Sequence, residues 1–538
     1  MSAVPARAGR VGAAQAREAR PVPAQAPRPT TQAAGAQAGR GPQAAPSGSG
    51  PAGGTGRAAA ATPTAAPVDR RRASPPAGLA ASGTNASTGP APSIGAGPAD
   101  ATARGALVRP DGGAGQGRER CREAQSRAEG GAPWPAWDAG PALYVHVPYC
   151  RQRCHYCDFN TYLLDPAGKV RYLGALEREL ALLAADPALT RPLVSVYVGG
   201  GTPSILEPAE LERLLAAVRR AFRLAPDAEI TVECNPGTLD EERLAVLRDG
   251  GVNRLSLGLQ AVQDELLRAI GRDHTWADFC ATYDRVRRAG FDNVNVDLIF
   301  GLPGQSLEQW EASLRAVVDL GPEHVSCYGL ELHPGTPFYR EWEAGRLQLP
   351  GEDAERAMFD RAYEVLGEAG FVRYEISNYA RPGRESVHNR VYWLNGSYLG
   401  AGPGAWSCWR GERRRNRLHP MAYAAALAEG RLPVDVTERV DRRRAMEDTM
   451  ILGLRLAEGV DEGRFARRFG LTPEEAFPRA IRRLLEEGWL VREGGRIRLS
   501  PAAVPVANSV LVAFVDTDDI RTGAGGGPGG VDAAAPTR

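Results

Sequence analysis

Short apolar segments alternate with amphipathic segments along the middle of the chain. The apolar segments are rich in Val, Ile and Leu and have strand length, whereas the leucines between them recur at helical spacing. Strands that alternate with helices favour parallel pairing with right-handed crossovers. The pattern predicts an α/β fold, an incomplete (β/α) barrel of six units. Its strands are expected at Leu143–Val147, Leu193–Val198, Glu229–Cys234, Arg254–Gln260, Asn293–Phe300 and His324–Leu332.

The pattern changes after about residue 346, where an α+β extension is predicted. A helix is expected up to about Gly370, and a strand at Phe371–Tyr379. From residue 434 to 515 the order of elements is typical of a small winged-helix-like domain. Acidic residues dilute its arginines, so no basic recognition face for nucleic acid is expected. Its helices are predicted at Met446–Leu456, Glu462–Phe469 and Pro473–Gly488, and its hairpin at Leu490–Leu499.

Both ends of the chain differ from the middle in composition. Residues 1–138 consist mainly of Ala, Gly, Pro, Ser, Thr and Gln, with 16 arginines against 8 acidic residues. Such a segment buries too little apolar surface to offset its ordering entropy, so residues 1–138 and 516–538 are predicted to be disordered. We therefore expect a barrel at 139–345, the extension at 346–433 and the small domain at 434–515. A basic arm can touch nucleic acid or lipid, but compositional bias is the favoured interpretation, and no nucleic-acid partner is expected.

Compartment follows from what the sequence lacks. No apolar run approaches the roughly 20 residues of a transmembrane helix, and no secretion signal is recognisable. The eight cysteines are therefore not expected to form a disulfide framework. We expect a reducing, cytoplasmic location, either free or peripheral to the membrane.

Three cysteines follow the first strand at C-x3-C-x2-C spacing: Cys150, Cys154 and Cys157. Thiolates are ligands for iron–sulfur clusters and for zinc. Three cysteines on a four-iron cubane leave one iron free to take a small molecule. A zinc site with His155 as the fourth ligand is the alternative, but zinc sites usually pair C-x2-C with a second, distant pair of ligands.

Further polar and glycine motifs fall where the predicted strands end. Parallel barrels gather their chemistry at the C-terminal strand ends. The glycine run Gly199–Gly201 with Thr202 lets backbone approach a ligand closely. The other strand-end candidates are Glu233, Gln260, Arg272 and Asp297; a structural ion pair is the alternative for any one of them.

A second motif, His388-Asn389-Arg390-Val391-Tyr392-Trp393, lies in the extension. His, Tyr and Trp near a glycine-rich turn are suited to line a flat, apolar ligand site, and His is a common axial ligand of haem iron. The alternative is a hydrogen-bonded histidine in the core or at the surface.

The cysteine spacing, the glycine run and the strand-end residues together resemble the radical S-adenosylmethionine (SAM) superfamily. Within it, the chain resembles the oxygen-independent coproporphyrinogen III oxidase-like group and, more narrowly, the HemW-type haem chaperones. The oxidases carry a further cysteine two positions after the third ligand, where this chain has Phe159. The H-N-x-x-Y-W motif of the chaperones is matched at every fixed position by residues 388–393.

The resemblance implies three cofactors: a [4Fe–4S] cluster, SAM and haem. The three cysteines of the motif would hold the cluster. His388, Asn389, Tyr392 and Trp393 would contact haem. The residues that would contact one or two SAM molecules are Tyr144, Tyr156, Gly200, Gly201, Thr202, Glu233, Gln260, Arg272 and Asp297.

Two functions stay open at this point. The first is a haem chaperone that delivers haem to apo haem proteins, among them membrane-bound respiratory complexes, with a homodimer as an open option. The second is a radical SAM oxidoreductase of the coproporphyrinogen III oxidase type, in porphyrin biosynthesis. The resemblance does not decide whether the chain is an enzyme, because Phe159 replaces the additional cysteine while the parts for SAM binding are present.

Overall fold

The computed structural model describes residues 141–515. The disorder predicted for residues 1–138 and 516–538 concerns parts of the chain that lie outside the described residues. No helix between residues 141 and 515 is long and apolar enough to cross a membrane.

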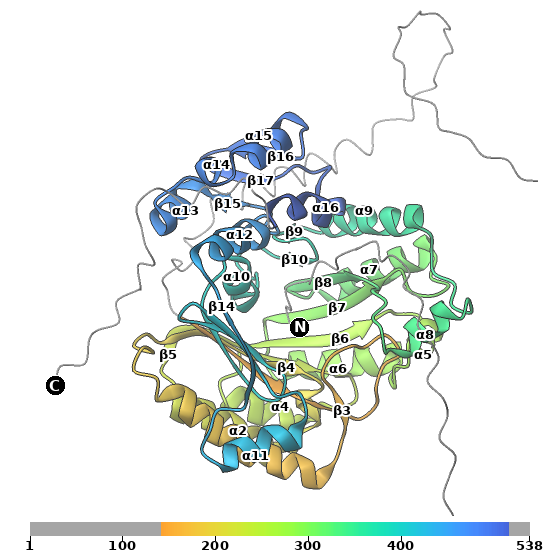
Figure 1. Ribbon diagram of the computed structural model, residues 1–538. Helices are drawn as coiled ribbons and strands as arrows, with labels where there is room; N and C mark the ends of the chain where they lie inside the picture. The colour runs from red at the N-terminus through yellow and green to blue at the C-terminus, as the bar shows by residue number, and fades with distance from the viewer. Residues whose placement is uncertain (1–140, 516–538) are drawn as a thin grey trace, which may run out of the picture. The chain divides into compact units, whose positions relative to one another are not determined.

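Most strands of the described chain join one large sheet (Figure 1). Its central strands are β1 (Ala142–Val147), β4 (Leu193–Gly200), β5 (Leu224–Cys234), β6 (Arg254–Gln260), β7 (Val294–Phe300) and β8 (His324–Gly329). These pair in parallel in the order of the sequence, from β1 to β8. The predicted α/β fold with parallel strands is confirmed.

Strands from the extension lengthen the sheet at both edges. β11 (Tyr398–Ala401) pairs in parallel with β1, and β12 (Trp406–Trp409), β13 (Glu412–Asn416) and β14 (Val434–Arg439) follow it outward as antiparallel strands. At the other edge, β10 (Asn378–Ala380) pairs with β8, and β9 (Val372–Arg373) with β10. The sheet stays open, since β14 and β9 are its ends. Because β11 adds a further parallel strand, the number of barrel units stays a prediction.

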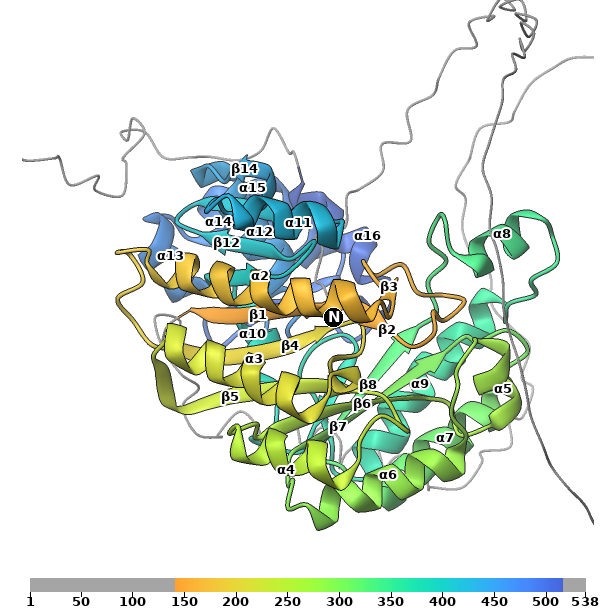
Figure 2. The same cartoon turned by 90° about the horizontal axis from the view of Figure 1, so that it is seen from below.

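Helices cover the outer face of the parallel strands, as Figure 2 shows for α2, α3, α4, α6 and α7. Their leucines and valines pack on the outward-facing residues of the strands in one continuous core. The helices before the extension are α2 (Pro166–Ala184), α3 (Pro208–Ala221), α4 (Glu241–Asp249), α5 (Asp264–Ala269), α6 (Trp276–Arg288), α7 (Leu307–Leu320) and α8 (Pro337–Glu343), and α9 (Glu352–Glu368) begins the extension.

The inward-facing positions of the same strands are largely polar. Along β4, for example, Val196 and Val198 belong to the outer core, whereas Ser195 and Tyr197 make polar contacts on the inner side. A strand alternates its faces with a period of two, so the two sets separate cleanly. The inner surface of the sheet is therefore the place where buried polar groups gather.

The extension also contributes α10 (Val387–Trp393) and α11 (Pro420–Ala428). The strand predicted at Phe371–Tyr379 is wrong, because the chain turns between β9 and β10. The Glu375 carboxylate accepts a hydrogen bond from the Ser377 backbone N–H (3.1 Å) and stabilises this turn.

The C-terminal part has its own apolar core. It consists of α12 (Arg442–Gly453), β15 (Val460–Asp461), α13 (Glu462–Phe469), α14 (Pro473–Ala476), α15 (Pro478–Glu486), β16 (Leu490–Glu493), β17 (Arg496–Leu499) and α16 (Ala507–Leu511). The hairpin is confirmed by the pairing of β16 with β17. The single helix predicted at Pro473–Gly488 is wrong, because Pro478 disfavours the helical conformation of Phe477 and divides it in two.

Candidate functional site

The three cysteines lie in the segment that follows β1. Cys150 ends the short strand β2 (Tyr149–Cys150), and Cys154 and Cys157 lie in the loop before β3 (Tyr162–Leu163). All three are partly exposed thiols outside any disulfide. The Thr202 hydroxyl donates to Cys150 Sγ (3.6 Å), and Arg272 Nη1 donates to Cys154 Sγ (3.6 Å). Burial raises the pKa of the Cys150 and Cys157 thiols. Three cysteines in one short segment, two of them with hydrogen-bond donors at sulfur, fit an iron–sulfur cluster, whose iron binds the thiolate form.

The zinc alternative required His155 to join the cysteines. Its Nδ1 instead makes a hydrogen bond with the Ala269 carbonyl (2.9 Å), and its ring packs on Phe338 with 5.7 Å between centroids. Within residues 141–515, no group of three or more His, Cys, Asp and Glu side chains is placed to hold a single metal ion. His155 fixes the loop rather than facing the sulfurs.

Two further contacts dock the cysteine loop on the segment after α5. The His155 backbone N–H donates to the Ile270 carbonyl (3.0 Å), and Gln152 Nε2 donates to the Gly271 carbonyl (2.7 Å). Gly271 has φ +75°, and a Cβ there would meet the His155 ring at 3.0 Å. The loop is therefore held against the same segment that carries Arg272.

The glycine run at the end of β4 is required by close contacts. A Cβ on Gly200 would lie 2.3 Å from the His146 ring, and its φ of +108° disfavours other residues. A Cβ on Gly201 would lie 2.5 Å from the Tyr149 carbonyl. The Gly200 N–H donates to the Glu233 carboxylate (3.0 Å), and the Tyr197 hydroxyl donates to the same carboxylate (2.8 Å). The glycine run thus places its backbone against the inward-facing side chains of His146 and Glu233.

Tyr144 lies on β1 beside this glycine run. Its hydroxyl makes a hydrogen bond with His146 Nδ1 (2.9 Å), and His146 Nε2 makes one with the Asn160 carbonyl (3.0 Å). Burial lowers the pKa of His146 to about 4, so the ring is neutral at pH 7. Tyr144, Gly200 and Glu233, predicted to contact one SAM, are linked through His146 and Tyr197.

Arg272 connects the cysteine loop with the ends of β5 and β6. Its Nη2 donates to Asn235 Oδ1 (2.9 Å) and to the Gly258 carbonyl (2.6 Å), while Nη1 reaches Cys154. Asn235 Nδ2 in turn donates to the Thr202 hydroxyl (3.0 Å). Thr202 and Arg272 are therefore brought together by a residue that the sequence reasoning missed, although Asn235 follows Glu233 by only two positions.

The remaining candidates at this end of the sheet are Tyr156, Gln260 and Asp297. Gln260 has φ +79° at a register shift between β6 and β7. Such strain in a residue other than glycine is typical of functional sites. Asp297 accepts from Ser256 (3.1 Å) and Asn295 (2.8 Å), and burial raises its pKa. Burial likewise raises the pKa of Tyr156, which packs beside the apolar cluster around α5.

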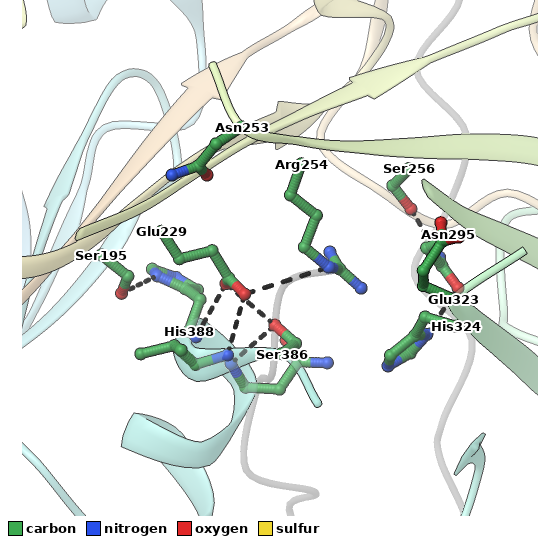
Figure 3. Close-up of polar contacts among 12 residues, drawn as sticks. Ser195, Glu229, Asn253, Arg254, Ser256, Asn295, Glu323, His324, Ser386 and His388 are labelled. Carbon is green, nitrogen blue, oxygen red and sulfur yellow. Dashed lines mark hydrogen bonds and ion pairs between the residues drawn. The ribbon is translucent and has the colours of Figure 1, made fainter. Parts of the chain in front are cut away.

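The second motif forms α10, on the inner side of the sheet (Figure 3). His388 is 1% exposed, and its ring stacks on Tyr197 at 5.1 Å between centroids. Its Nδ1 makes a hydrogen bond with the Ser195 hydroxyl (2.9 Å) and its Nε2 one with the Tyr392 hydroxyl (2.8 Å). Burial lowers its pKa to about 3. In this arrangement, both ring nitrogens of His388 are engaged, so a haem ligand there requires one of the two hydrogen bonds to break.

Glu229 holds the N-terminus of α10 against β5 (Figure 3). Its carboxylate accepts from the Ser386 hydroxyl (3.2 Å) and from the backbone N–H groups of Val387 and His388 (both 3.0 Å). A carboxylate at a helix N-terminus satisfies N–H groups that lack partners within the helix. Arg254, 2% exposed, lies 3.9 Å from the same carboxylate. Ser195 and Glu229 were not among the predicted site residues. A polar side chain within an otherwise apolar strand was the feature of the sequence that could have indicated them.

The four motif residues do not share one surface. His388 and Tyr392 face the sheet, whereas Trp393 faces the C-terminal part and lies under the Arg455 guanidinium, 5.1 Å from the ring centroid. The Asn389 backbone N–H is bound by the Ser386 hydroxyl (3.3 Å). The predicted haem contacts are thus divided between two sides of a short helix.

The two candidate regions lie at different depths of one interior. Ser195 precedes Gly199 by four residues on β4, and Glu229 precedes Glu233 by four on β5. At about 3.3 Å per residue, the partners of α10 lie about 13 Å along the strands from the strand-end residues. Tyr197 spans this interval, because its ring stacks on His388 while its hydroxyl donates to Glu233.

Comparisons with known proteins agree with this architecture. The model of the radical SAM superfamily matches residues 144–317, and that of the HemN C-terminal domain matches residues 440–506. The Heme chaperone HemW of Bacillus subtilis is 37% identical over 375 residues, which cover 70% of this chain and 99% of that protein. The Heme chaperone HemW of Mycobacterium tuberculosis is 39% identical over 394 residues, covering 72% and 98%.

Eukaryotic and structural relatives are also similar. Radical S-adenosyl methionine domain-containing protein 1, mitochondrial, of Bos taurus is 34% identical, covering 70% of this chain and 87% of that one. Among solved structures, coproporphyrinogen III oxidase (HemN) of Escherichia coli aligns with a TM-score of 0.62 at 25% identity, covering 72% of this chain and 93% of that chain.

Proposed function

The chain belongs to the HemW family of radical SAM proteins, and on this basis we propose that it is a haem chaperone that binds haem and passes it to apo haem proteins. The observation that carries the proposal is the identity of 37% over 99% of a relative named Heme chaperone HemW. The intact H-N-x-x-Y-W motif on α10 and Phe159 in place of a further cysteine support it.

The cofactors we assign to the core are a [4Fe–4S] cluster on Cys150, Cys154 and Cys157, and SAM beside it. The donor set fits, because three sulfurs lie in one short segment and two of them, those of Cys150 and Cys154, accept hydrogen bonds from Thr202 and Arg272. When bound and reduced, such a cluster supplies one electron to SAM. The residues of this chain hold and orient the two cofactors. Gly200 and Glu233 form one wall of the proposed SAM site, and Arg272 places its charge beside the cysteine loop.

We place haem contact at the α10 motif. His388 is neutral and buried, so its imidazole is in the protonation state that a metal ligand needs. Ligation at Nε2 displaces the Tyr392 hydroxyl, and ligation at Nδ1 displaces the Ser195 hydroxyl. Transfer then consists of re-forming that hydrogen bond as haem leaves. The clients proposed are haem proteins, including membrane-bound respiratory enzymes.

The second candidate is a radical SAM oxidoreductase of the coproporphyrinogen III oxidase type. The observation that favours it is the strained backbone of Gln260 together with the network from Cys154 through Arg272 to Thr202. A chaperone has no evident need for such strain at a strand end. Anaerobic incubation with SAM, dithionite and coproporphyrinogen III separates the two functions. Protoporphyrinogen formation above background refutes a chaperone without enzyme activity.

The haem proposal is tested by anaerobic haemin titration followed by absorbance. The wild-type protein is compared with His388→Ala and with His419→Ala, in which an exposed histidine is removed. A stoichiometric site that weakens in His388→Ala alone supports haem contact at α10. Equal, loose binding by all three proteins refutes it.

A further inference from the structure

A pocket lies between α10 and the C-terminal part of the chain. Its apolar lining includes Trp393, Leu394 and Phe465, and its charged lining includes Arg464, Arg468 and Arg496. Trp393 comes from the H-N-x-x-Y-W motif, Arg464 and Arg468 from α13, and Arg496 from β17. The pocket thus joins the motif to the part of the chain that matches the HemN C-terminal domain.

The charge around this pocket is one-sided. Three guanidinium groups line it together with one carboxylate, that of Asp461, which lies 3.6 Å from Arg496; the Glu458 carboxylate, outside the lining, lies 3.8 Å from the same arginine. Asp461 also accepts a hydrogen bond from the Arg464 backbone N–H (2.7 Å) and so caps α13. Burial lowers the pKa of Arg464 to about 10, and this side chain is only partly exposed, whereas Arg468 reaches the surface. Such charges are stabilised by an anion that forms hydrogen bonds with them.

Trp393 adds a neutral donor to the charged ones. Its Nε1 is buried and, among residues 141–515, has no hydrogen-bond partner. A buried N–H without an acceptor costs about 1–3 kcal/mol, and a ligand oxygen beside the indole would remove that cost. One indole N–H and guanidinium groups over an apolar floor are suited to carboxylates on the edge of a flat, apolar molecule.

We propose that this pocket binds the two propionate carboxylates of haem, with Arg464 and Arg496 as the main anion contacts and Trp393 against the ring edge. The inference rests on the proposed haem function and adds to it the groups that recognise the acidic edge of the porphyrin. It also gives the C-terminal part a role, because both arginines belong to it.

The experiment compares haemin with haemin dimethyl ester, in which both carboxylates are esterified. Wild-type protein is expected to bind haemin about tenfold more tightly than the ester, or better, since charged hydrogen bonds are lost. The double variant Arg464→Gln, Arg496→Gln is expected to bind both ligands with nearly equal Kd. Arg467→Gln is the matched control, because Arg467 lies on α13 but is exposed and does not line the pocket.

The outcomes separate the pocket proposal from the haem chaperone proposal. Stoichiometric haemin binding with the same preference in the double variant as in the wild type overturns the pocket and leaves the haem chaperone in place. Equal binding of haemin and ester by the wild type also overturns the pocket alone. Failure of the wild type to bind haemin overturns both proposals. If the double variant does not fold, Arg464→Gln alone and the wild-type comparison of the two ligands still decide.

Discussion

The docking of α10 is expected to depend on the Glu229 carboxylate. Its two oxygens accept three hydrogen bonds from residues 386–388, and it is the carboxylate paired with Arg254. In Glu229→Gln, one oxygen becomes an NH2 group, which cannot accept from the Val387 N–H. Arg254, which is only 2% exposed, then also loses its countercharge.

The magnitude follows from these two losses. Removing one partner of a buried ion pair costs about 3–5 kcal/mol. The 3.9 Å separation makes this a loose pair, so we take the lower end, about 3 kcal/mol. Since about 1.4 kcal/mol is a factor of ten, the opening equilibrium of α10 should rise about 100-fold.

The assay is amide hydrogen exchange of α10, which reports local opening. Peptides covering residues 387–393 should exchange about 100-fold faster in Glu229→Gln than in the wild type, while peptides from α2 are unchanged. Glu368→Gln, which changes an exposed carboxylate on α9, is the control and should leave α10 protected. Exchange of α10 in Glu229→Gln within about threefold of the wild type would show that the carboxylate does not hold the helix.

Three further predictions concern the cofactor loop, the glycine run and pH. Cys154→Ser should abolish stable [4Fe–4S] incorporation, because two thiolates hold a cubane poorly; unchanged iron and sulfide content contradicts this. Gly200→Ala should weaken SAM binding and lower the free energy of unfolding, because the new Cβ meets the His146 ring. The control is Gly237→Ala, where φ is +75° but no neighbour lies within 4 Å, so the free energy of unfolding should fall by only about 1 kcal/mol. Because the folded-state pKa of His388 is about 3, below the ordinary value of 6.5, the unfolded chain takes the proton more readily. The free energy of unfolding should therefore fall with pH from about 6.5 toward 4, by about 3 kcal/mol, and by less in His388→Gln when measured by denaturant titration; equal pH slopes in both proteins refute a buried, neutral His388.

Local sequence determined the strand-and-helix order of the core. Strands β1, β4, β6 and β7 lie where apolar runs predicted them, because a buried strand needs consecutive β-forming residues whatever its neighbours are. The cysteine spacing and the glycine run are also local features. The glycine run contacts the adjoining strand, and Thr202 at its end donates a hydrogen bond to Cys150.

The start of α4 shows a limit of prediction from local sequence. Thr238 and Glu241 suggest a capping box for the next helix, yet α4 is capped by Asp240, whose side chain accepts from the Arg243 N–H (2.7 Å). The Thr238 hydroxyl instead donates to the Asn235 carbonyl (2.6 Å) and shapes the turn after β5. Two good capping residues compete here, and the turn that follows the strand decides between them.

Only the tertiary structure decided the environment of the second motif. Nothing near residue 388 in the sequence indicates that its ring Nδ1 meets Ser195, or that Glu229 caps its helix. Ser195 and Glu229 lie more than 150 residues from His388 in the sequence, on strands of the sheet that β11 joins by pairing with β1, whereas Tyr392 lies one helical turn away. The sequence by itself determined which side chains could serve chemistry; the pairing of distant strands decided that His388 is buried and engaged while Trp393 faces a pocket lined in part by arginines.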